Sequence, residues 1–149
     1  MDLPFTGGCA CGAVRYECSA EPMLLRNCHC RDCQRAAGSA YAALLSVPVN
    51  AFQFKQRKPK VFTTQAENGN TVSRGFCPEC GCLVCGDASA FPDITSVTAA
   101  SLDDPSWFQP TFDLFVTSAQ PWNVMNPDIR KFATMPTAEQ WEELLAGQE

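Results

Sequence analysis

Alternating apolar and polar residues, rather than a helical period, dominate most of the chain. Near its start, Val14, Tyr16 and Cys18 alternate with charged neighbours after a Gly-Gly turn, which predicts a half-buried strand. Eleven prolines favour short strands and loops over long helices. Other apolar stretches predict strands over residues 40–47, 61–64, 71–76, 94–99 and 112–117.

Two β-hairpins are predicted in the middle of the chain. The aromatic pair within 52–54 and the apolar stretch 61–64 indicate the first one. The Asn-Gly pair at 68–69 is a strong turn signal and indicates the second, between strands 61–64 and 71–76. The later strand of this second hairpin runs directly into a Cys-x2-Cys knuckle.

Helical signals occur in two places, and only the C-terminal one is clear. Residues 31–37 can form a short helix that ends at Gly38. Near the C-terminus, Thr137 and Gln140 form a capping-box pattern, and Gly147 can end the helix that follows. The apolar face of that helix consists of Trp141, Leu144 and Leu145. We therefore expect a mostly β fold with two or three short helices, the last of which packs on a sheet.

Length and composition favour one globular domain. A chain of 149 residues with 46% hydrophobic and 18% charged residues can bury a substantial core. No internal repeat, low-complexity segment or linker divides the sequence, so we expect residues 1–149 to form a single domain. No apolar run approaches the ~20 residues that a membrane helix needs, which argues against a membrane protein.

The distribution of charge suggests which partners the protein binds. Its net charge of −5 argues against nucleic-acid binding, which requires a basic surface. Between Arg26 and Arg74, however, there are eight basic and two acidic residues, so this stretch carries +6 and the remainder −11. Such a stretch attracts small anions. Arg31 and Arg35 are the best candidates to bind them, whereas the basic residues of 55–60 are more typical of a solvated loop or a protected edge strand.

Ten cysteines raise the choice between disulfides and metal ligands. The chain begins without the charged and apolar leader of a secreted protein, so we expect a cytoplasmic protein, in which disulfides are rare. Closely spaced cysteine pairs also suit chelation better than disulfides, whose geometry constrains the Cα separation. A redox dithiol at Cys77 and Cys80 is the main alternative, but no βαβ pattern surrounds it. We therefore expect zinc as the cofactor.

The motif Cys28-His29-Cys30-Arg31-Asp32-Cys33 places three thiols together, with no fourth cysteine nearby in sequence. Three protein ligands are typical of a zinc site that keeps a position for substrate, whereas four ligands close it. A thiol that binds in the open position is deprotonated and can attack a small carbonyl compound. Arg31 and Arg35 could then bind substrate carboxylates, unless they are ordinary surface residues.

The remaining cysteines can form a closed site in two ways. One complete set of four is Cys9, Cys11, Cys77 and Cys80. The alternative is Cys77, Cys80, Cys82 and Cys85, although the last two are more typical of strand residues after the knuckle. Cys18 alternates with buried positions, so we interpret it as a small core residue.

His29 is the only histidine and lies between two cysteines of the three-cysteine motif. A role as a proton shuttle is possible because an unperturbed histidine has a pKa of ~6.5. Alternation within a tight knuckle would instead point His29 away from Cys28 and Cys30, which favours local packing or hydrogen bonding.

Together, the cysteine motifs resemble those of a known family. The likeness is carried by residues 8–16 (GCACGAVRY), 28–35 (CHCRDCQR) and 74–81 (RGFCPECG), in that order. They are similar to the glutathione-dependent formaldehyde-activating (GFA) family, which includes centromere protein V. Two positions depart from the family pattern: Cys82, and Asp113, where many relatives carry histidine.

This resemblance implies an Mss4-like fold of twisted antiparallel sheets, with two zinc ions per chain held by knuckles. It implies a structural zinc at Cys9, Cys11, Cys77 and Cys80. It also implies a catalytic zinc at Cys28, Cys30 and Cys33. The implied activity is that of a carbon–sulfur lyase that joins formaldehyde to a small thiol, glutathione. The alternative is a non-catalytic, zinc-stabilised module that binds another protein, because a fold does not determine function.

Overall fold

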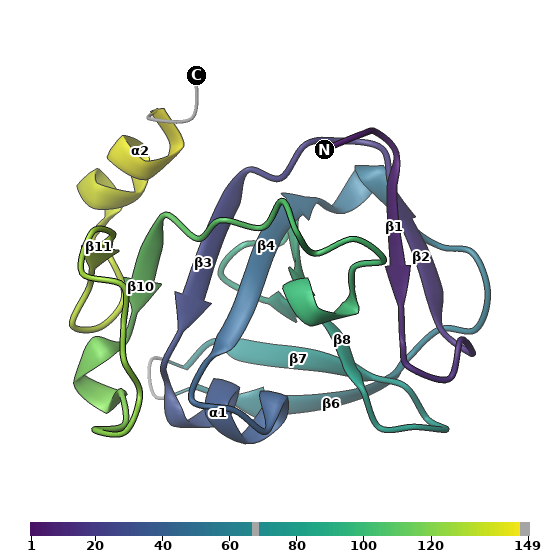
Figure 1. Ribbon diagram of the computed structural model, residues 1–149, viewed down its shortest axis with the longest axis horizontal. Coiled ribbons are helices and arrows are strands. Elements are labelled where there is room, and N and C mark those ends of the chain that lie inside the picture. Colours follow the sequence, from purple (N-terminus) through teal and green to yellow (C-terminus); the bar gives the residue numbers. More distant parts are fainter. Residues whose placement is uncertain (67–68, 147–149) are drawn as a thin grey trace.

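The computed structural model describes residues 1–66 and 69–146, and short β-strands make up most of its regular structure (Figure 1). The strands are β1 (Phe5–Gly8), β2 (Arg15–Cys18), β3 (Leu24–Cys28), β4 (Ala42–Pro48), β5 (Phe52–Phe54), β6 (Lys60–Gln65), β7 (Thr71–Phe76), β8 (Leu83–Ala88), β9 (Ile94–Thr98), β10 (Phe112–Leu114) and β11 (Arg130–Lys131). The helices are α1 (Arg31–Ala37), α2 (Ala138–Ala146) and the short 3-10 helices η1 (Val49–Ala51), η2 (Ala99–Ser101) and η3 (Val116–Ser118).

The strands form two sheets. The larger sheet has eight strands in the order β11-β10-β3-β4-β9-β8-β7-β6, and the smaller one has the order β1-β2-β5. Neighbouring strands are antiparallel except at one end of the larger sheet, where β10 runs parallel to β3 and to β11. The expected mostly β fold with a short C-terminal helix is therefore confirmed.

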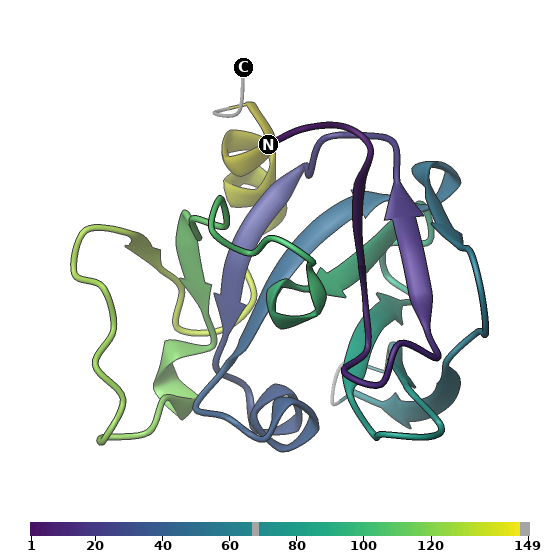
Figure 2. The same ribbon diagram turned by 45° about the vertical axis from the view of Figure 1, so that its right-hand side comes forward.

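The first hydrophobic core lies between the two sheets, whose separation is clearest in Figure 2. Val14, Tyr16 and Cys18, predicted to alternate toward the core, are all buried. They pack in one cluster with Leu45 of β4 and Val97 of β9. The small sheet thus covers one face of the large sheet, together with Ala99 of η2 and Leu102.

Of the two predicted hairpins, the first is wrong and the second is confirmed. β5 pairs with β2 rather than with β6, and Phe54 lies opposite Tyr16. The rings of Phe52 and Tyr16 lie 5.0 Å apart, so the aromatic side of β5, whose phenylalanines are half-buried, packs against the core of the small sheet. β6 pairs with β7 as predicted. Gly69 in their turn has a φ of +82°, while Asn68 lies outside the described residues.

The C-terminal helix begins with the predicted capping box. The Thr137 backbone N–H donates to Gln140 Oε1 at 2.9 Å, and the Gln140 N–H donates to Thr137 Oγ1 at 3.3 Å. These two reciprocal bonds satisfy N–H groups that have no partner within the helix. The predicted helix end at Gly147 lies outside the described residues.

A second core holds α2 beside the β3 and β10 end of the large sheet (Figure 1). Leu144 is buried in it, and the Trp141 ring lies 6.0 Å from that of Phe112. Leu145, predicted to share this face, is 44% exposed. In the described part of the chain, no helix is long and apolar enough to span a membrane.

The strand predicted over 112–117 is shorter than expected. β10 ends at Leu114 because Phe115 adopts a left-handed conformation, with φ of +57°, and η3 follows. A left-handed residue turns the backbone away from the sheet. The segment after β10 therefore passes alongside α1 instead of extending the sheet, as the hydrogen bond from Gln34 Nε2 to the Ser118 carbonyl shows.

Candidate metal centres

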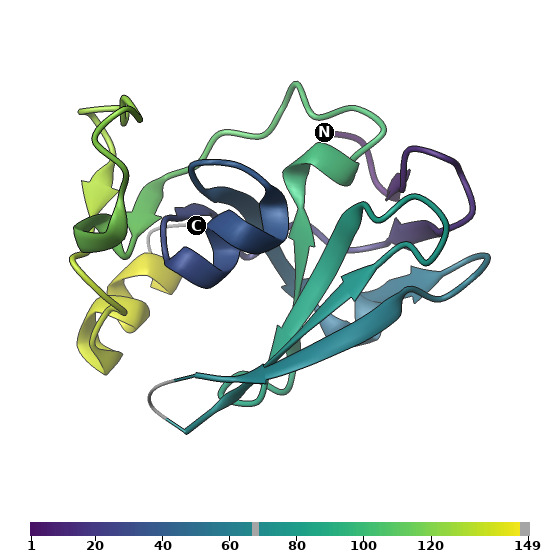
Figure 3. The ribbon, with the colours of Figure 1, turned by 90° about the horizontal axis from the view of Figure 1, so that it is seen from below.

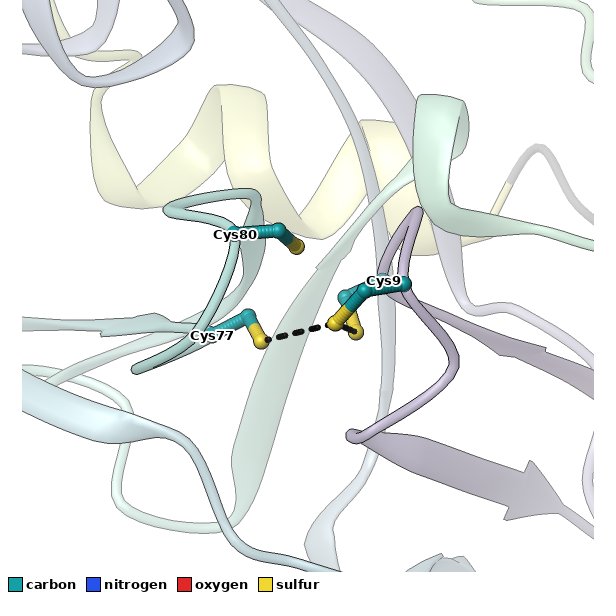
Figure 4. A group of neighbouring side chains, drawn as sticks. Cys9, Cys77 and Cys80 are labelled. Atoms are coloured by element: carbon teal, nitrogen blue, oxygen red, sulfur yellow. Dashed lines mark hydrogen bonds between the residues drawn. The ribbon is translucent and has the colours of Figure 1, made fainter.

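Two groups of cysteines could each hold a metal ion. The first group joins the loop after β1 to the loop between β7 and β8, and Figure 4 shows the sulfurs of Cys9, Cys77 and Cys80 pointing toward one another. The Sγ atoms of Cys9 and Cys11 lie 3.5 Å apart, and those of Cys11 and Cys77 lie 3.7 Å apart. Zn–S bonds of about 2.3 Å in a tetrahedron place two sulfurs about 3.8 Å apart, so these spacings fit zinc. The group consists of Cys9, Cys11, Cys77 and Cys80.

Both knuckles of this four-cysteine group use glycine to reverse the chain. Gly12 and Gly81 have φ values of +79° and +74°, a conformation that other residues rarely adopt. The Gly81 N–H donates to the Cys77 carbonyl at 2.9 Å, and the Val14 N–H donates to Cys9 Sγ at 3.2 Å. Backbone N–H groups directed at sulfur favour the thiolate, which is the form that binds zinc.

The second group lies where β3 meets α1. Cys28 ends the strand, Cys30 is the N-cap of the helix, and Cys33 lies in its first turn. Their sulfurs lie within 4.8 Å of one another, and the Cys30 thiol accepts a hydrogen bond from the Cys33 N–H at 3.4 Å. Cys28 is buried, whereas the other two are half-buried. The predicted helix over 31–37 supplies this geometry, and it ends at Gly38 as expected.

The three thiols of this group share protons unequally. Hydrogen bonds from Cys28 and, to a smaller extent, from Cys33 lower the pKa of Cys30 to about 2. The same interaction with Cys30 raises the pKa of Cys28 well above its ordinary value. Because one thiolate is already stabilised, the group offers a negative charge to a cation before the other thiols lose their protons.

The other three cysteines lie outside both groups. Cys18 is fully buried, and Cys85 lies in β8, where burial raises the pKa of its thiol to about 12. Cys82 immediately precedes β8. Hydrogen bonds from the Cys82 backbone and, to a smaller extent, from the Cys11 backbone lower the pKa of Cys80 to about 6. In the described residues, Cys77 and Cys80 are grouped with Cys9 and Cys11. The alternative set, with Cys82 and Cys85, is therefore not the one that the structure assembles.

His29 points away from the cysteine sulfurs and joins the knuckle to β10. Its Nε2 atom lies 3.1 Å from Asp113 Oδ1, and both side chains are only 1% exposed. Asn27 donates to the same oxygen at 3.0 Å, and the His29 backbone N–H donates to the Leu114 carbonyl at 2.9 Å. These contacts favour the local, structural interpretation of His29.

Arg31 and Arg35, the predicted carboxylate ligands, are exposed on the outer side of α1. Arg31 donates a hydrogen bond to Gln34 Oε1. Gln34 in turn donates to the carbonyls of His29 and Ser118, at 2.5 and 2.9 Å, and so fixes the helix against its neighbours. An open hollow of about 280 Å³ lies here, lined by Arg31, Gln34, Arg35, Gly38, Ser39 and Trp122.

Two arginines that the sequence analysis counted only for their charge lie close to the three-cysteine group. Arg74 of β7 is buried, and its Nη2 atom lies 3.9 Å from Cys33 Sγ. Burial lowers the pKa of Arg26 in β3, while the nearby Cys28 and Cys33 raise it. For Arg26 the sequence held a signal, because alternation in a strand puts residue 26 on the same side as Cys28. For Arg74 the contact depends on long-range packing.

Comparison with known protein families matches residues 4–118 to the family described as glutathione-dependent formaldehyde-activating enzyme. The chain belongs to this GFA family. It is also similar to a crystal structure of a Rhodobacter sphaeroides protein, with 25% sequence identity, a TM-score of 0.51, and coverage of 66% of this chain and 87% of that one. Family membership and the two cysteine groups together indicate a zinc-binding GFA-type protein.

Proposed function

We propose that the protein is a zinc-dependent carbon–sulfur lyase of the GFA type. It binds a thiol such as glutathione at the three-cysteine group and promotes adduct formation with formaldehyde or a related small aldehyde. The observation that carries the proposal is the difference between the two groups: one assembles four sulfurs, and the other assembles three in the described residues. The family match supports the choice of glutathione and formaldehyde.

In this proposal the two groups hold two zinc ions per chain with different roles. The four-cysteine group (Cys9, Cys11, Cys77 and Cys80) stabilises the fold, and the three-cysteine group (Cys28, Cys30 and Cys33) serves catalysis. Bound zinc would hold the substrate thiol as a thiolate. Cys30 and Cys33 are half-buried, so part of this group is exposed to solvent. We also propose a cytoplasmic location, where cysteines stay reduced and can bind zinc.

The proposed reaction is an addition that needs no leaving group. A bond forms between the thiol sulfur and the aldehyde carbon, the carbonyl π electrons move to oxygen, and the thiol proton ends on that oxygen. Binding both reactants side by side removes the entropic cost of their encounter. We propose that Arg31 and Arg35 contribute by attracting substrate carboxylates to the outer side of α1, where both guanidinium groups are accessible.

Cobalt substitution tests the proposal, because the ligand-field spectrum of cobalt reports how many thiolates surround the metal. Adding glutathione should change the spectrum of the three-cysteine site from three to four thiolates, and S-methylglutathione should not. Formation of the formaldehyde adduct should accelerate with the zinc protein and lose this acceleration in Cys30→Ser.

The control variant Cys82→Ser removes the extra thiol beside Cys80 and should leave the response to glutathione intact. A spectrum of four thiolates at the Cys28 site without any added thiol would contradict the proposal. The alternative, a zinc-stabilised module that binds another protein, would then replace it.

A further inference from the structure

One face of the large sheet presents two arginines beside the three-cysteine group. In a sheet, residues directly opposite one another on paired strands point to the same side. Ser46 of β4 lies opposite Ser96 of β9, Ser96 lies opposite Gly86 of β8, and Gly86 lies opposite Arg74 of β7. Arg26 reaches the same row from β3, since its guanidinium donates to both serine hydroxyls.

The two guanidinium groups are held in place by hydroxyl groups and not by carboxylates. Nη2 of Arg26 donates to Ser96 Oγ at 2.8 Å, and Nη1 of Arg74 donates to Thr64 Oγ1 at 3.3 Å. Within the described residues, neither arginine forms an ion pair with a carboxylate. The arginines that do form such pairs have more exposed side chains. They are Arg15, Arg57 and Arg130.

Arg74 is buried and Arg26 half-buried, and the thiols of the three-cysteine group are the nearest groups that can carry negative charge. Removing a guanidinium from water without a carboxylate partner is costly, so this arrangement favours binding of a carboxylate. Each guanidinium has five N–H donors, and neutral hydroxyls together with a distant sulfur use only some of them. Gly86 lies between Ser96 and Arg74 in the row. Because glycine has no side chain, no side chain at this position separates the two arginines. A planar carboxylate matches the paired N–H groups of arginine.

The contact between Arg74 and Cys33 places this anion site next to the proposed thiol site. Figure 3 shows α1 (dark blue), which carries Cys33, beside the large sheet, and the contact between Arg74 and Cys33 links this helix to β7. We propose that Arg26 and Arg74 bind a carboxylate of the thiol substrate, and that the protein therefore selects thiols that carry a carboxylate. This inference rests on the proposed function, since it assumes that the substrate sulfur binds at Cys28, Cys30 and Cys33.

A second role for the same arginines must be distinguished by experiment. Positive charge beside several thiolates stabilises them whatever else the substrate carries. If Arg26 and Arg74 acted only in this way, their removal would weaken the binding of every thiol equally. A carboxylate site predicts instead that the loss depends on the substrate.

The test compares 3-mercaptopropionate with 2-mercaptoethanol, two small thiols that end in a carboxylate and a hydroxyl group. Their affinities are measured by titrating the ligand-field absorption of the cobalt-substituted protein. The carboxylate thiol should bind at least about tenfold more tightly, as expected for charge-assisted hydrogen bonds. Arg26→Met and Arg74→Met should each remove most of this preference and change 2-mercaptoethanol binding little. The control Arg57→Met, which removes an exposed arginine paired with Glu79, should keep the preference.

Two outcomes of the titration overturn the carboxylate site. One is equal affinity of the two thiols for the unmodified protein, and the other is an equal loss for both thiols in the arginine variants. If neither thiol changed the spectrum, the proposed sulfur ligation would be contradicted. The anion site is then tested by a second measurement.

That measurement uses S-methylglutathione, which carries carboxylates but has no free thiol. In zinc-loaded protein labelled with [15N]arginine, it should shift the guanidinium Nε–H signals of Arg26 and Arg74, assigned from the two Met variants, and leave that of Arg57 unchanged. Such a shift supports the anion site independently of sulfur ligation. Unchanged Arg26 and Arg74 signals at saturating concentration, together with no thiol preference, would overturn it.

Discussion

At the scale of single residues, the buried pair of His29 and Asp113 explains how a short knuckle keeps its shape. Asp113 Oδ1 accepts hydrogen bonds from both His29 and Asn27, on the side of β3 and β10 opposite to Cys28 and Leu114. The pair therefore fixes the backbone between Cys28 and Cys30 on the side opposite to Cys28. The side that carries Cys28 remains free for the cysteine sulfurs. A position that the family resemblance marked as unusual thus has a structural role here.

We predict that Asp113→Leu destabilises the protein by about 1–3 kcal/mol, because it leaves the His29 imidazole buried without its partner. Urea unfolding measures the loss. The same variant should release zinc from the three-cysteine group at a lower chelator concentration than the unmodified protein.

The matched control is Asp113→Asn, which keeps an oxygen that can accept the same hydrogen bonds. It should lose much less stability than Asp113→Leu. Equal losses in the two variants would show that the contact with His29 does not stabilise the knuckle.

At the scale of elements, close backbone contact sets how the small sheet packs. A Cβ atom at Gly7 of β1 would lie 2.2 Å from Tyr16 Oη and 2.3 Å from the Ser101 carbonyl oxygen. Only glycine allows the Tyr16 hydroxyl to reach Ser101 Oγ, 2.9 Å away, across this strand. The requirement for glycine at position 7 thus follows from packing between elements that are distant in sequence.

We predict that Gly7→Ala destabilises the protein by at least about 1–3 kcal/mol, since the added methyl group must displace Tyr16 or the Ser101 backbone. Chemical denaturation followed by tryptophan fluorescence measures this change. Gly86→Ala is the matched control in a strand of the other sheet, because its nearest neighbour lies at 3.1 Å. A loss for Gly7→Ala no larger than for Gly86→Ala would contradict the packing argument.

Local signals predicted those elements whose determinants are local. The capping box of Thr137 and Gln140 and the Gly38 helix end describe neighbouring residues, and both are confirmed. The partner of β5 could not be predicted in this way, because alternation shows which side of a strand is apolar but not which strand it pairs with. The aromatic residues of β5 pack on Tyr16, more than thirty positions earlier in the chain.

The same limit applies to the candidate sites. Cys28, Cys30 and Cys33 lie within one motif, so their association was predicted from spacing alone. The pairing of the Cys9 knuckle with the Cys77 knuckle came from the family resemblance, since spacing left Cys82 and Cys85 as alternatives. Arg74 reaches Cys33 only through the order of strands in the large sheet, which no local pattern reveals.

At the scale of the whole molecule, the two cysteine groups differ in how much of the chain they connect. Cys11 and Cys77 are 66 positions apart, and their knuckles join the small sheet to the β7–β8 loop of the large sheet. The three-cysteine group, in contrast, spans a single strand-to-helix junction. A cross-link that closes a long loop restricts the unfolded chain more than one that closes a short loop. A metal at the four-cysteine group should therefore contribute much more to folding.

We predict that Cys9→Ala prevents stable folding, whereas Cys30→Ala yields a folded protein. Metal analysis should give close to two zinc ions per chain for the unmodified protein and one for Cys30→Ala, because each group holds its own ion. Circular dichroism during titration with a chelator should show a first zinc lost without unfolding and a second lost together with the β signal. Cys18→Ala, which removes a buried cysteine outside both groups, is the control and should retain two zinc ions. If Cys9→Ala and Cys30→Ala unfolded alike, the separate structural and catalytic roles assigned to the two groups would be wrong.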